Sequence, residues 1–391
     1  MKESLIFIPF QDAYCFLNDG ILTREYAALL QLKRYGAKSF TLVNKPRTIL
    51  DARRFDIDEA RFPQGTHESE ARYILENALT INPASLLDPR QVLGKRKWWS
   101  SGYMRALPLI KKDLSQSLAY SNNPFSWKLL LELKQRGCTI CFDAMDNMST
   151  YPHFWKKEQE EAYFGYRTVL QFADFTSVNS LRTKQFFLDE FDKDVPLIKN
   201  GVFQNILRPH ARTSQVEYVT ELKSAYRTCA GFVGKIGMRI DHRLIKHIAN
   251  EVRDCLFVFV GPKLNGQCRD FDDVVSECPN VIKLDAIPSA YLFEMLDVFD
   301  FLMIPYSVGK NENSGDPLKL YQYFLTGKPI LCTSIKEVDS YAHLITVSDN
   351  CNVWADRLRQ DAALHDYSSV VDDITWEHRF EPLAEFCKGL A

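Results

Sequence analysis

The chain has 391 residues, of which 46% are hydrophobic and 25% are charged, and its formal net charge is −2. This composition excludes a disordered or fibrous chain, and the balanced charge gives no sign of a nucleic-acid partner. The length exceeds that of one ordinary core, so we expect two domains. No apolar run reaches the roughly 20 residues of a membrane-spanning helix, and no signal-peptide pattern opens the chain, which together predict a cytoplasmic protein.

The first half alternates short apolar runs with amphipathic helices. Residues 23–36 predict a helix that begins after Thr23 and ends at Gly36. Because the apolar runs are hydrophobic almost throughout, they predict parallel sheets that helices cover on both faces. The runs that predict buried strands lie at 4–10, 39–44, 139–144, 174–179 and 195–200.

The second half repeats this alternation. Asp241 is placed to cap a helix with one apolar stripe, and residues 370–391 predict a last amphipathic helix. A polar stretch at 199–215 contains Gly and Pro and is typical of a linker between domains. The runs that predict strands lie at 230–236, 256–262, 281–287, 300–306, 329–333 and 343–349. Ligands bind beyond the carboxyl ends of strands in such sheets, so a cleft between the domains is the expected site.

The chain contains ten cysteines, which raises the question of disulfides or zinc. Cys138 and Cys141 form the single C-x-x-C motif, and no second pair or His pair follows them. The motif lies in an apolar run, so we expect reduced, buried thiols.

A glycine-rich turn, "AGFVGKIGMRIDHRL", follows a predicted strand in the second half and precedes a predicted helix. Its glycine spacing differs from the dinucleotide-binding fingerprint, and no acidic residue ends the next strand, so hydride chemistry is disfavoured. Gly234 would let a ligand approach the backbone closely. Lys235 and Arg239 would then meet a diphosphate, unless they are ordinary solvated surface charges.

A second chemistry-bearing stretch is "ENSGDPLKLYQYFLTGKPIL", in which Asp316 and Pro317 predict the N-cap and first position of a helix. Lys319 in the first turn opposes the helix dipole, and an anion bound at the helix end would explain it. Gln322 lies on the same face one turn later and offers an amide to a polar ligand. The alternative is an ordinary exposed helix.

The segments "GFVGKI", "FVFVGP", "FDFLMIPY" and "DPLKLYQYFLTGKPIL", in this order, resemble the donor-binding domain of GT-B glycosyltransferases, in particular family 4-like bacterial surface-polysaccharide enzymes. In the first half, "FDAMDN", "ADFTSVNS" and "IKNGV" resemble pieces of the acceptor domain. The resemblance implies an α/β GT-B fold in which two Rossmann-like domains face each other across a cleft. The expected domains are 1–205 for the acceptor and 206–370 for the donor, with a helix at 371–391 that packs back on the first domain.

The resemblance further implies transfer of a hexosyl unit from a nucleotide sugar, UDP-sugar above all, to a saccharide or polyprenyl-linked acceptor. It implies no metal and no other cofactor. Many retaining relatives carry two glutamates separated by seven residues, whereas this chain has Gln322 at the second place and Ser314 eight residues before it. Lys319 and Gln322 instead resemble a pair in the glucuronosyltransferase of xanthan assembly, which implies inverting chemistry and a uronic acid donor, although neutral-sugar enzymes also carry a lysine here.

An inverting mechanism needs a base in the acceptor domain, at the carboxyl end of a strand. The segment "TICFDAMDNMST" supplies Asp146 as the first candidate and Asp143 as the second, unless they only cap the following turn. The phosphate charge of the leaving group would meet the cations named above. Tyr306 either lines the donor site or packs at a strand end.

A third stretch, "GKRKWWSSGYMRALPLIKK", places Lys95, Arg96 and Lys97 before Trp98 and Trp99. Cations and tryptophans favour an anionic membrane interface, so we predict a peripheral contact on the inner face of the plasma membrane. One alternative is a basic, aromatic groove for an anionic saccharide, and another is a solvated loop with buried tryptophans.

The same residues leave three other functions open. A retaining transferase would work without a base, a nucleotide-sugar epimerase would need no acceptor, and an inactive module would only bind the nucleotide sugar.

Overall fold

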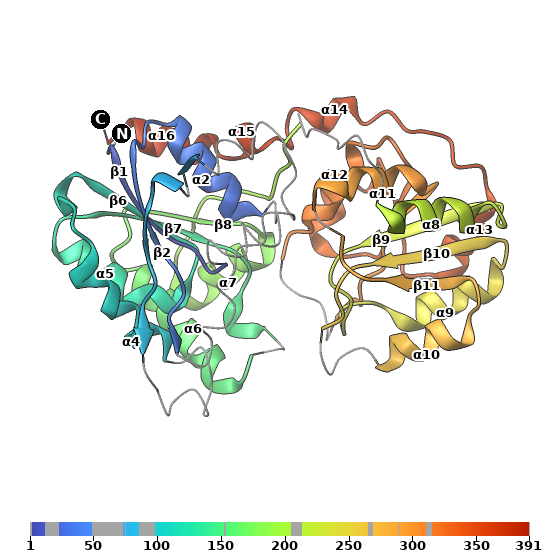
Figure 1. Ribbon diagram of the computed structural model, residues 1–391, viewed down its shortest axis with the longest axis horizontal. Coiled ribbons are helices and arrows are strands. Elements are labelled where there is room, and N and C mark those ends of the chain that lie inside the picture. The colour runs from blue at the N-terminus through green and yellow to red at the C-terminus, as the bar shows by residue number, and fades with distance from the viewer. Residues whose placement is uncertain are drawn as a thin grey trace. The chain divides into compact units, whose positions relative to one another are not determined.

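The computed structural model describes residues 2–11, 23–48, 73–74, 76–85, 98–151, 154–204, 213–264, 269–287, 289–309 and 315–390. The chain divides into two compact units. Unit 1 comprises Met1–Gly201, Ser314–Asp316 and Trp376–Ala391, and unit 2 comprises Val202–Asn313 and Pro317–Thr375. Each unit contains a six-stranded sheet with helices on both of its faces (Figure 1).

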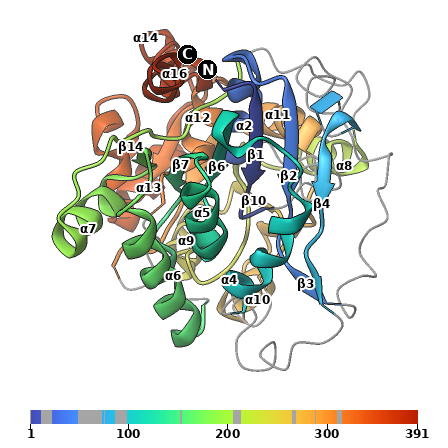
Figure 2. The same ribbon diagram turned by 90° about the vertical axis from the view of Figure 1, so that its left-hand side faces the viewer.

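Unit 1 has a parallel sheet with the strand order β4-β2-β1-β6-β7-β8. Figure 2 shows β2, β1 and β6 side by side. The strands are β1 (Ser4–Ile8), β2 (Ser39–Val43), β4 (Leu79–Ile81), β6 (Ser117–Ser121), β7 (Thr139–Ala144) and β8 (Phe175–Val178), with a small separate sheet of β3 (Arg47–Thr48) and β5 (Ala84–Ser85). The helices are α2 (Arg24–Arg34), α4 (Trp99–Gly102), α5 (Trp127–Gln135), α6 (Lys156–Val169), α7 (Leu181–Phe191), α15 (Trp376–Arg379) and α16 (Glu381–Lys388), with 3-10 turns η4 (Tyr103–Leu109), η5 (Leu114–Gln116), η6 (Pro124–Ser126) and η7 (Met148–Thr150).

Successive side chains of a strand point to opposite faces of the sheet, so unit 1 has two packed layers. One face carries Ile6 and Phe142, which join a core cluster with buried side chains of α5 and α6. The opposite face carries Phe7, whose ring stacks on Tyr120 at 5.2 Å. Figure 1 shows α5 and α6 on one side of this sheet and α2 and α16 on the other.

Unit 2 has a parallel sheet with the order β11-β10-β9-β12-β13-β14 and a continuous core on both faces. Helix α9 packs against both α10 and α13, and α8 packs against α11. The strands are β9 (Thr228–Val233), β10 (Cys255–Val260), β11 (Val281–Leu284), β12 (Phe301–Ile304), β13 (Ile330–Cys332) and β14 (Thr346–Val347). The helices are α8 (Ser214–Lys223), α9 (His242–Glu251), α10 (Arg269–Glu277), α11 (Leu292–Val298), α12 (Leu318–Phe324), α13 (Cys351–Arg359) and α14 (Ser368–Val371), with 3-10 turns η8 (Ser289–Tyr291) and η9 (Lys336–Tyr341).

Every predicted apolar run except 195–200 contains a strand. In that run the backbone follows the end of β8, because Val178 N–H donates to Pro196 O at 3.0 Å and Ile198 N–H donates to Val178 O at 2.8 Å. Pro196 has no N–H with which to extend a ladder, so the prediction of a strand here was wrong.

Sequence reasoning missed β6, which lies at the centre of its sheet. Its sequence, SLAYS, contains two serines and only three apolar residues. The serines are tolerated inside because Ser117 Oγ donates to Asp113 O at 2.7 Å and Ser121 Oγ donates to Ile8 O at 2.8 Å.

Two of the predicted helix boundaries are confirmed, and two predictions about helix ends are wrong. Helix α2 begins after Thr23, and Asp241 caps α9 by accepting the N–H groups of Arg243 and Leu244, both at 3.0 Å. Helix α12 begins at Leu318 with Pro317 as its N-cap, so the assignment of Asp316 as the cap was wrong. The single helix expected at 370–391 is three short helices, α14, α15 and α16.

The thiols of Cys138 and Cys141 are free and buried, as predicted. Burial raises the pKa of Cys138 to about 12. Within the described ranges, no helix is long and apolar enough to span a bilayer.

Candidate functional site

The candidate site in unit 2 includes two backbone turns that lie close together. At the carboxyl end of β9, Gly234 has a φ of +150° and its N–H donates to Val260 O at 2.8 Å. After β10, Gly261 has a φ of +147°, and a Cβ there would lie 2.0 Å from Gly234 O. Both positions therefore require glycine, and the loops after β9 and β10 lie against each other.

Arg239 is held against the end of β12 by backbone hydrogen bonds. Ser307 N–H donates to Arg239 O at 2.7 Å, and Asp241 N–H donates to Pro305 O at 2.8 Å. The Arg239 guanidinium carbon consequently lies 3.8 Å from the centre of the Tyr306 ring, a cation–π contact. Lys235, in the same loop, is exposed and takes no part in this contact.

Lys319, in the first turn of α12, brings a second cation to the same tyrosine. Its Nζ donates a hydrogen bond to Tyr306 Oη and lies 4.8 Å from the centre of the Phe232 ring. A Cβ at Gly234 would lie 3.1 Å from Lys319 Nζ, so the glycine leaves room for the ammonium group. The loop after β9, the end of β12 and the start of α12 thus place two cations around one tyrosine. We call these three residues the cationic cluster (Arg239, Tyr306 and Lys319).

The electrostatics of the cationic cluster are unbalanced. Burial would raise the pKa of Tyr306, but Arg239 and Lys319 outweigh it and the pKa is lowered. Burial, helped by Arg239, lowers the pKa of Lys319. Among the described residues no carboxylate pairs with either cation, and Arg239 Nε is buried without a hydrogen-bond partner. A bound anion would supply both the missing charge and the missing acceptor.

The other residues that the sequence assigned to the donor are more scattered. Gln322 is half-buried one turn after Lys319. Asp316 belongs to unit 1, where its carboxylate accepts the N–H of Asn200 at 2.6 Å and its carbonyl accepts from Asn200 Nδ2 at 2.8 Å. Ser314 lies outside the described residues.

The basic, aromatic stretch is only partly described, because Lys95, Arg96 and Lys97 lie outside the described residues. Trp98 is 2% exposed, which favours the alternative of a buried tryptophan over a membrane contact for this residue. Trp99 is half-buried, and its ring packs beside Phe10 and Phe125.

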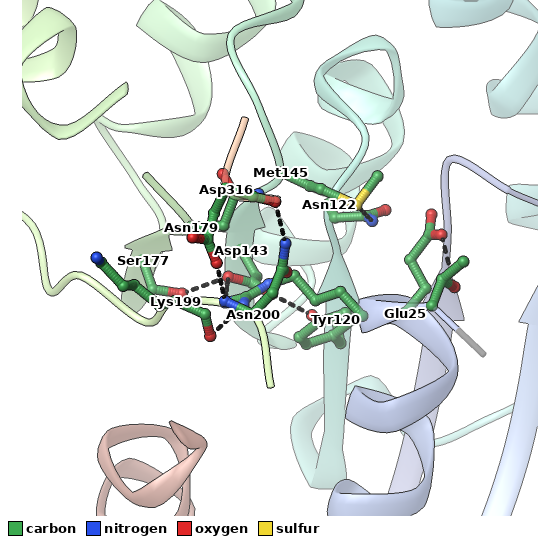
Figure 3. A network of polar contacts seen from close by, with 12 residues as sticks. Glu25, Tyr120, Asn122, Asp143, Met145, Ser177, Asn179, Lys199, Asn200 and Asp316 are labelled. Carbon is green, nitrogen blue, oxygen red and sulfur yellow. Dashed lines mark hydrogen bonds and ion pairs between the residues drawn. The ribbon is translucent and has the colours of Figure 1, made fainter. Parts of the chain in front are cut away.

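In unit 1, Asp143 is the centre of a buried polar network (Figure 3). Its carboxylate accepts from Arg24 Nε at 2.7 Å and Arg24 Nη2 at 2.8 Å, and also from Tyr120 Oη at 2.5 Å and Ser177 Oγ at 2.7 Å. Burial would raise the pKa of Asp143, but Arg24 and these donors hold it below its usual value. A carboxylate that is 1% exposed and already accepts four hydrogen bonds has no acceptor capacity left for a substrate hydroxyl, which favours a structural role for Asp143 over that of a base.

Asp146, at the loop that follows β7, has a different environment. It is half-buried and adopts the left-handed backbone conformation, with a φ of +60°. Its Oδ2 accepts from Tyr151 Oη at 2.6 Å, and its Oδ1 accepts from Asn179 Nδ2 at 3.1 Å. Asn179 also accepts the N–H of Asp146 at 2.9 Å. A carboxylate with two hydrogen bonds and partial exposure keeps capacity for a proton, and strained backbone is common at functional sites.

Sequence reasoning missed the partners of both aspartates. Arg24, Tyr120 and Ser177 come from three separated segments, and no local pattern links them to Asp143. Asn179 was within reach, since it ends the predicted strand 174–179 and polar residues at the carboxyl ends of parallel strands share one edge of the sheet. Across the described residues, no three His, Cys, Asp or Glu side chains gather as metal ligands do.

No protein-family model matches the chain. A stretch of 105 residues is 28% identical to the putative teichuronic acid biosynthesis glycosyltransferase TuaH of Bacillus subtilis strain 168. The match covers 27% of this chain and 26% of TuaH, so it spans about a quarter of each protein.

Solved structures match over nearly the whole chain. HepE of Anabaena, in complex with UDP and glucose, has a TM-score of 0.60 at 11% identity, over 98% of this chain and 95% of HepE. The apo structure of OtsA has a TM-score of 0.67 at 10% identity, over 98% of this chain and 99% of OtsA. A second OtsA structure, named as trehalose-6-phosphate synthase, has a TM-score of 0.63 at 11% identity, over 99% of both chains. With its two six-stranded parallel sheets, the chain has the α/β GT-B fold that the sequence resemblance implied.

Proposed function

We propose that the chain is a glycosyltransferase that moves a hexosyl unit from a UDP-sugar to a saccharide or polyprenyl-linked acceptor in cell-surface polysaccharide synthesis. The observation that carries this proposal is the cationic cluster, in which Arg239 and Lys319 converge on Tyr306 without a carboxylate partner among the described residues. A nucleotide diphosphate has the charge and the acceptor oxygens that this arrangement lacks. UDP and glucose in the HepE complex, and teichuronic acid biosynthesis in the name of TuaH, support the choice of donor and of pathway class.

The cationic cluster would stabilise the leaving group. As the bond between the anomeric carbon and the diphosphate oxygen breaks, the electron pair stays on that oxygen, and the negative charge grows beside Arg239 and Lys319. Two fixed cations would do electrostatically what a bound metal ion does in other enzymes, so we propose that no metal takes part. A uronic acid donor would bring a carboxylate as a further partner for a cation of this unit.

Asp146 is the residue that we propose as the base. It would take the proton of the acceptor hydroxyl while the hydroxyl oxygen forms its bond to the anomeric carbon from the face opposite to the leaving UDP. Asn179 and Tyr151 fix the direction of its carboxylate. The product would then have the inverted anomeric configuration.

Isothermal titration with UDP, GDP and ADP tests the donor half of the proposal. We expect UDP to bind, and a chain that binds none of the three nucleotides would refute the proposal. Turnover of UDP-glucose, UDP-glucuronic acid and UDP-N-acetylglucosamine, followed by proton NMR of the product, would identify the sugar and its anomeric configuration.

The variant Asp146→Asn tests the base. We expect turnover to fall by roughly 10²- to 10⁴-fold with UDP affinity unchanged, because a base acts only in the transition state. A product with retained configuration, made equally well by the variant, would show a retaining transferase. Release of an epimerised sugar nucleotide would show an epimerase, and UDP binding without turnover would show a binding module.

A further inference from the structure

Beside the candidate base, half-buried aromatic side chains from separate segments of unit 1 meet. The Phe10 ring, just after β1, lies 6.0 Å from Trp99 and 6.4 Å from Phe154 between ring centres. Phe154 in turn stacks on Tyr151 at 5.3 Å. All four rings pack at the margin of the core and keep partial exposure, so they present aromatic surface outside it. We call these four residues the aromatic platform.

The aromatic platform is continuous with Asp146. Tyr151, its last member, donates from Oη to Asp146 Oδ2 at 2.6 Å. Asn179 holds the other oxygen of the same carboxylate at 3.1 Å. The apolar surface therefore ends in hydrogen-bonding groups, which is the combination that a pyranose ring requires, since its C–H groups form an apolar face and its hydroxyl groups form a polar rim.

A buried polar anchor holds Phe10 in place. Phe10 N–H donates to Asn122 Oδ1 at 2.8 Å, and the next residue, Gln11, donates from its N–H to Glu25 Oε1 at 2.8 Å. Glu25 is fully buried, and none of the described cations pairs with it. A buried carboxylate without a cation is unfavourable for folding, and this one is stabilised by accepting the N–H of Gln11, which fixes the backbone directly after Phe10.

We propose that the aromatic platform binds a pyranose ring of the acceptor and presents one of its hydroxyl groups to Asp146. This proposal rests on the proposed function, because the acceptor hydroxyl matters only if a sugar is transferred to it. The hydrogen-bonding rim at Tyr151 and Asp146 favours a saccharide over an isoprenoid chain, which has no group to meet it.

Saturation-transfer difference NMR on the full chain, saturated with UDP, tests the proposal. The probes are methyl β-glucopyranoside, methyl β-galactopyranoside, methyl α-mannopyranoside and farnesol. We expect transfer to the ring C–H protons of at least one pyranoside. The variants Phe10→Leu and Phe154→Leu keep an apolar side chain and remove the aromatic face. Each should lower the affinity for that pyranoside by roughly threefold to tenfold.

The matched control is Phe175→Leu. Phe175 is also half-buried and stacks on another ring, that of Phe386 at 5.0 Å. It lies at the amino end of β8, whereas Phe10 and Asp146 follow the carboxyl ends of their strands. This variant should keep pyranoside binding, and the thermal unfolding of all three variants shows whether a loss comes from the fold.

The outcomes separate this proposal from the proposed function. If the unmodified chain does not bind UDP, the proposed function is refuted. Retained UDP binding with no transfer to any pyranoside, or with equal transfer in Phe10→Leu, Phe154→Leu and the unmodified chain, would overturn the platform. Transfer to farnesol alone would overturn it as well, because the rings would then serve a lipid.

Discussion

Arg24→Met tests whether Asp143 is a structural residue. Arg24 donates to both oxygens of Asp143, and the two side chains are each 1% exposed. The substitution keeps an unbranched apolar side chain and removes the guanidinium, so the carboxylate stays buried with only Tyr120 and Ser177 as donors. Breaking a buried pair in this way costs about 3–5 kcal/mol, which is a large part of the roughly 5–15 kcal/mol that stabilises a domain.

The pH dependence gives the sign of the effect. In the unmodified protein the pKa of Asp143 is lowered from 3.8, so its contribution to stability is complete above that value and is lost only as the pH falls through the lower folded-state pKa. Without Arg24, burial raises the pKa of Asp143 instead. The penalty in the variant is then largest at neutral pH and is relieved as the carboxylate takes up a proton, so the gap between the two proteins narrows in acid.

Urea denaturation at pH 7.5 and pH 5, followed by circular dichroism and tryptophan fluorescence, measures this gap. The double variant Arg24→Met with Asp143→Asn should recover part of the lost stability, because it removes the uncompensated charge. A loss below about 1 kcal/mol at neutral pH, or a gap that does not narrow at the lower pH, would refute the structural assignment of Asp143.

Two further predictions concern the other titratable groups. Lys319→Ala should lower the affinity for UDP by about tenfold to a hundredfold in isothermal titration, because a charged hydrogen bond is lost. The control Lys235→Ala, at an exposed lysine of the loop after β9, should lower it by less than about threefold. Equal losses of affinity in the two variants would contradict the role of the cationic cluster. Burial raises the pKa of Glu25 from 4.5 to about 7. The free energy of unfolding should therefore rise by at most about 3 kcal/mol as the pH falls from about 7 to 4.5. Glu25→Gln should flatten this rise in urea midpoints, and an unchanged slope would show that another group causes it.

The sequence predicted the strands of both sheets best where apolar, β-branched and aromatic residues form unbroken runs, as in β10 with CLFVFV. It failed at β6, because the serines of SLAYS are satisfied by hydrogen bonds to partners that include Asp113 and Ile8, which a local apolar pattern does not show. It also failed at 195–200, where the run pairs with β8 at an isolated bridge between Leu197 and Val178, and Pro196 has no N–H with which to extend it.

The same limit applies to the candidate site. Arg239 and Lys319 were predicted from local features, the glycine-rich turn and the unusual lysine at a helix start. Their meeting at Tyr306 depends on the end of β12, to which backbone hydrogen bonds tie the Arg239 loop. Arg24 and Asp143, 119 positions apart, carry no local sign of their pairing, so the sequence alone could not distinguish the environment of Asp143 from that of Asp146.

The last prediction concerns Gly315, which packs against the carboxylate of Asp146. A Cβ at Gly315 would lie 2.3 Å from Asp146 Oδ1 and 2.9 Å from its Cγ, which no real contact tolerates. The carboxylate cannot yield freely, since Tyr151 and Asn179 hold its two oxygens. Gly315→Ala should therefore displace the base and lower turnover by about 10²-fold, as small displacements of reacting groups do, with UDP affinity unchanged. The matched control is Gly389→Ala, where the nearest atom to a Cβ is 3.4 Å away and turnover should be kept. Full turnover in Gly315→Ala would mean either that Asp146 is not the base or that Gly315 leaves it during the reaction, and the effect of Asp146→Asn on turnover decides between the two.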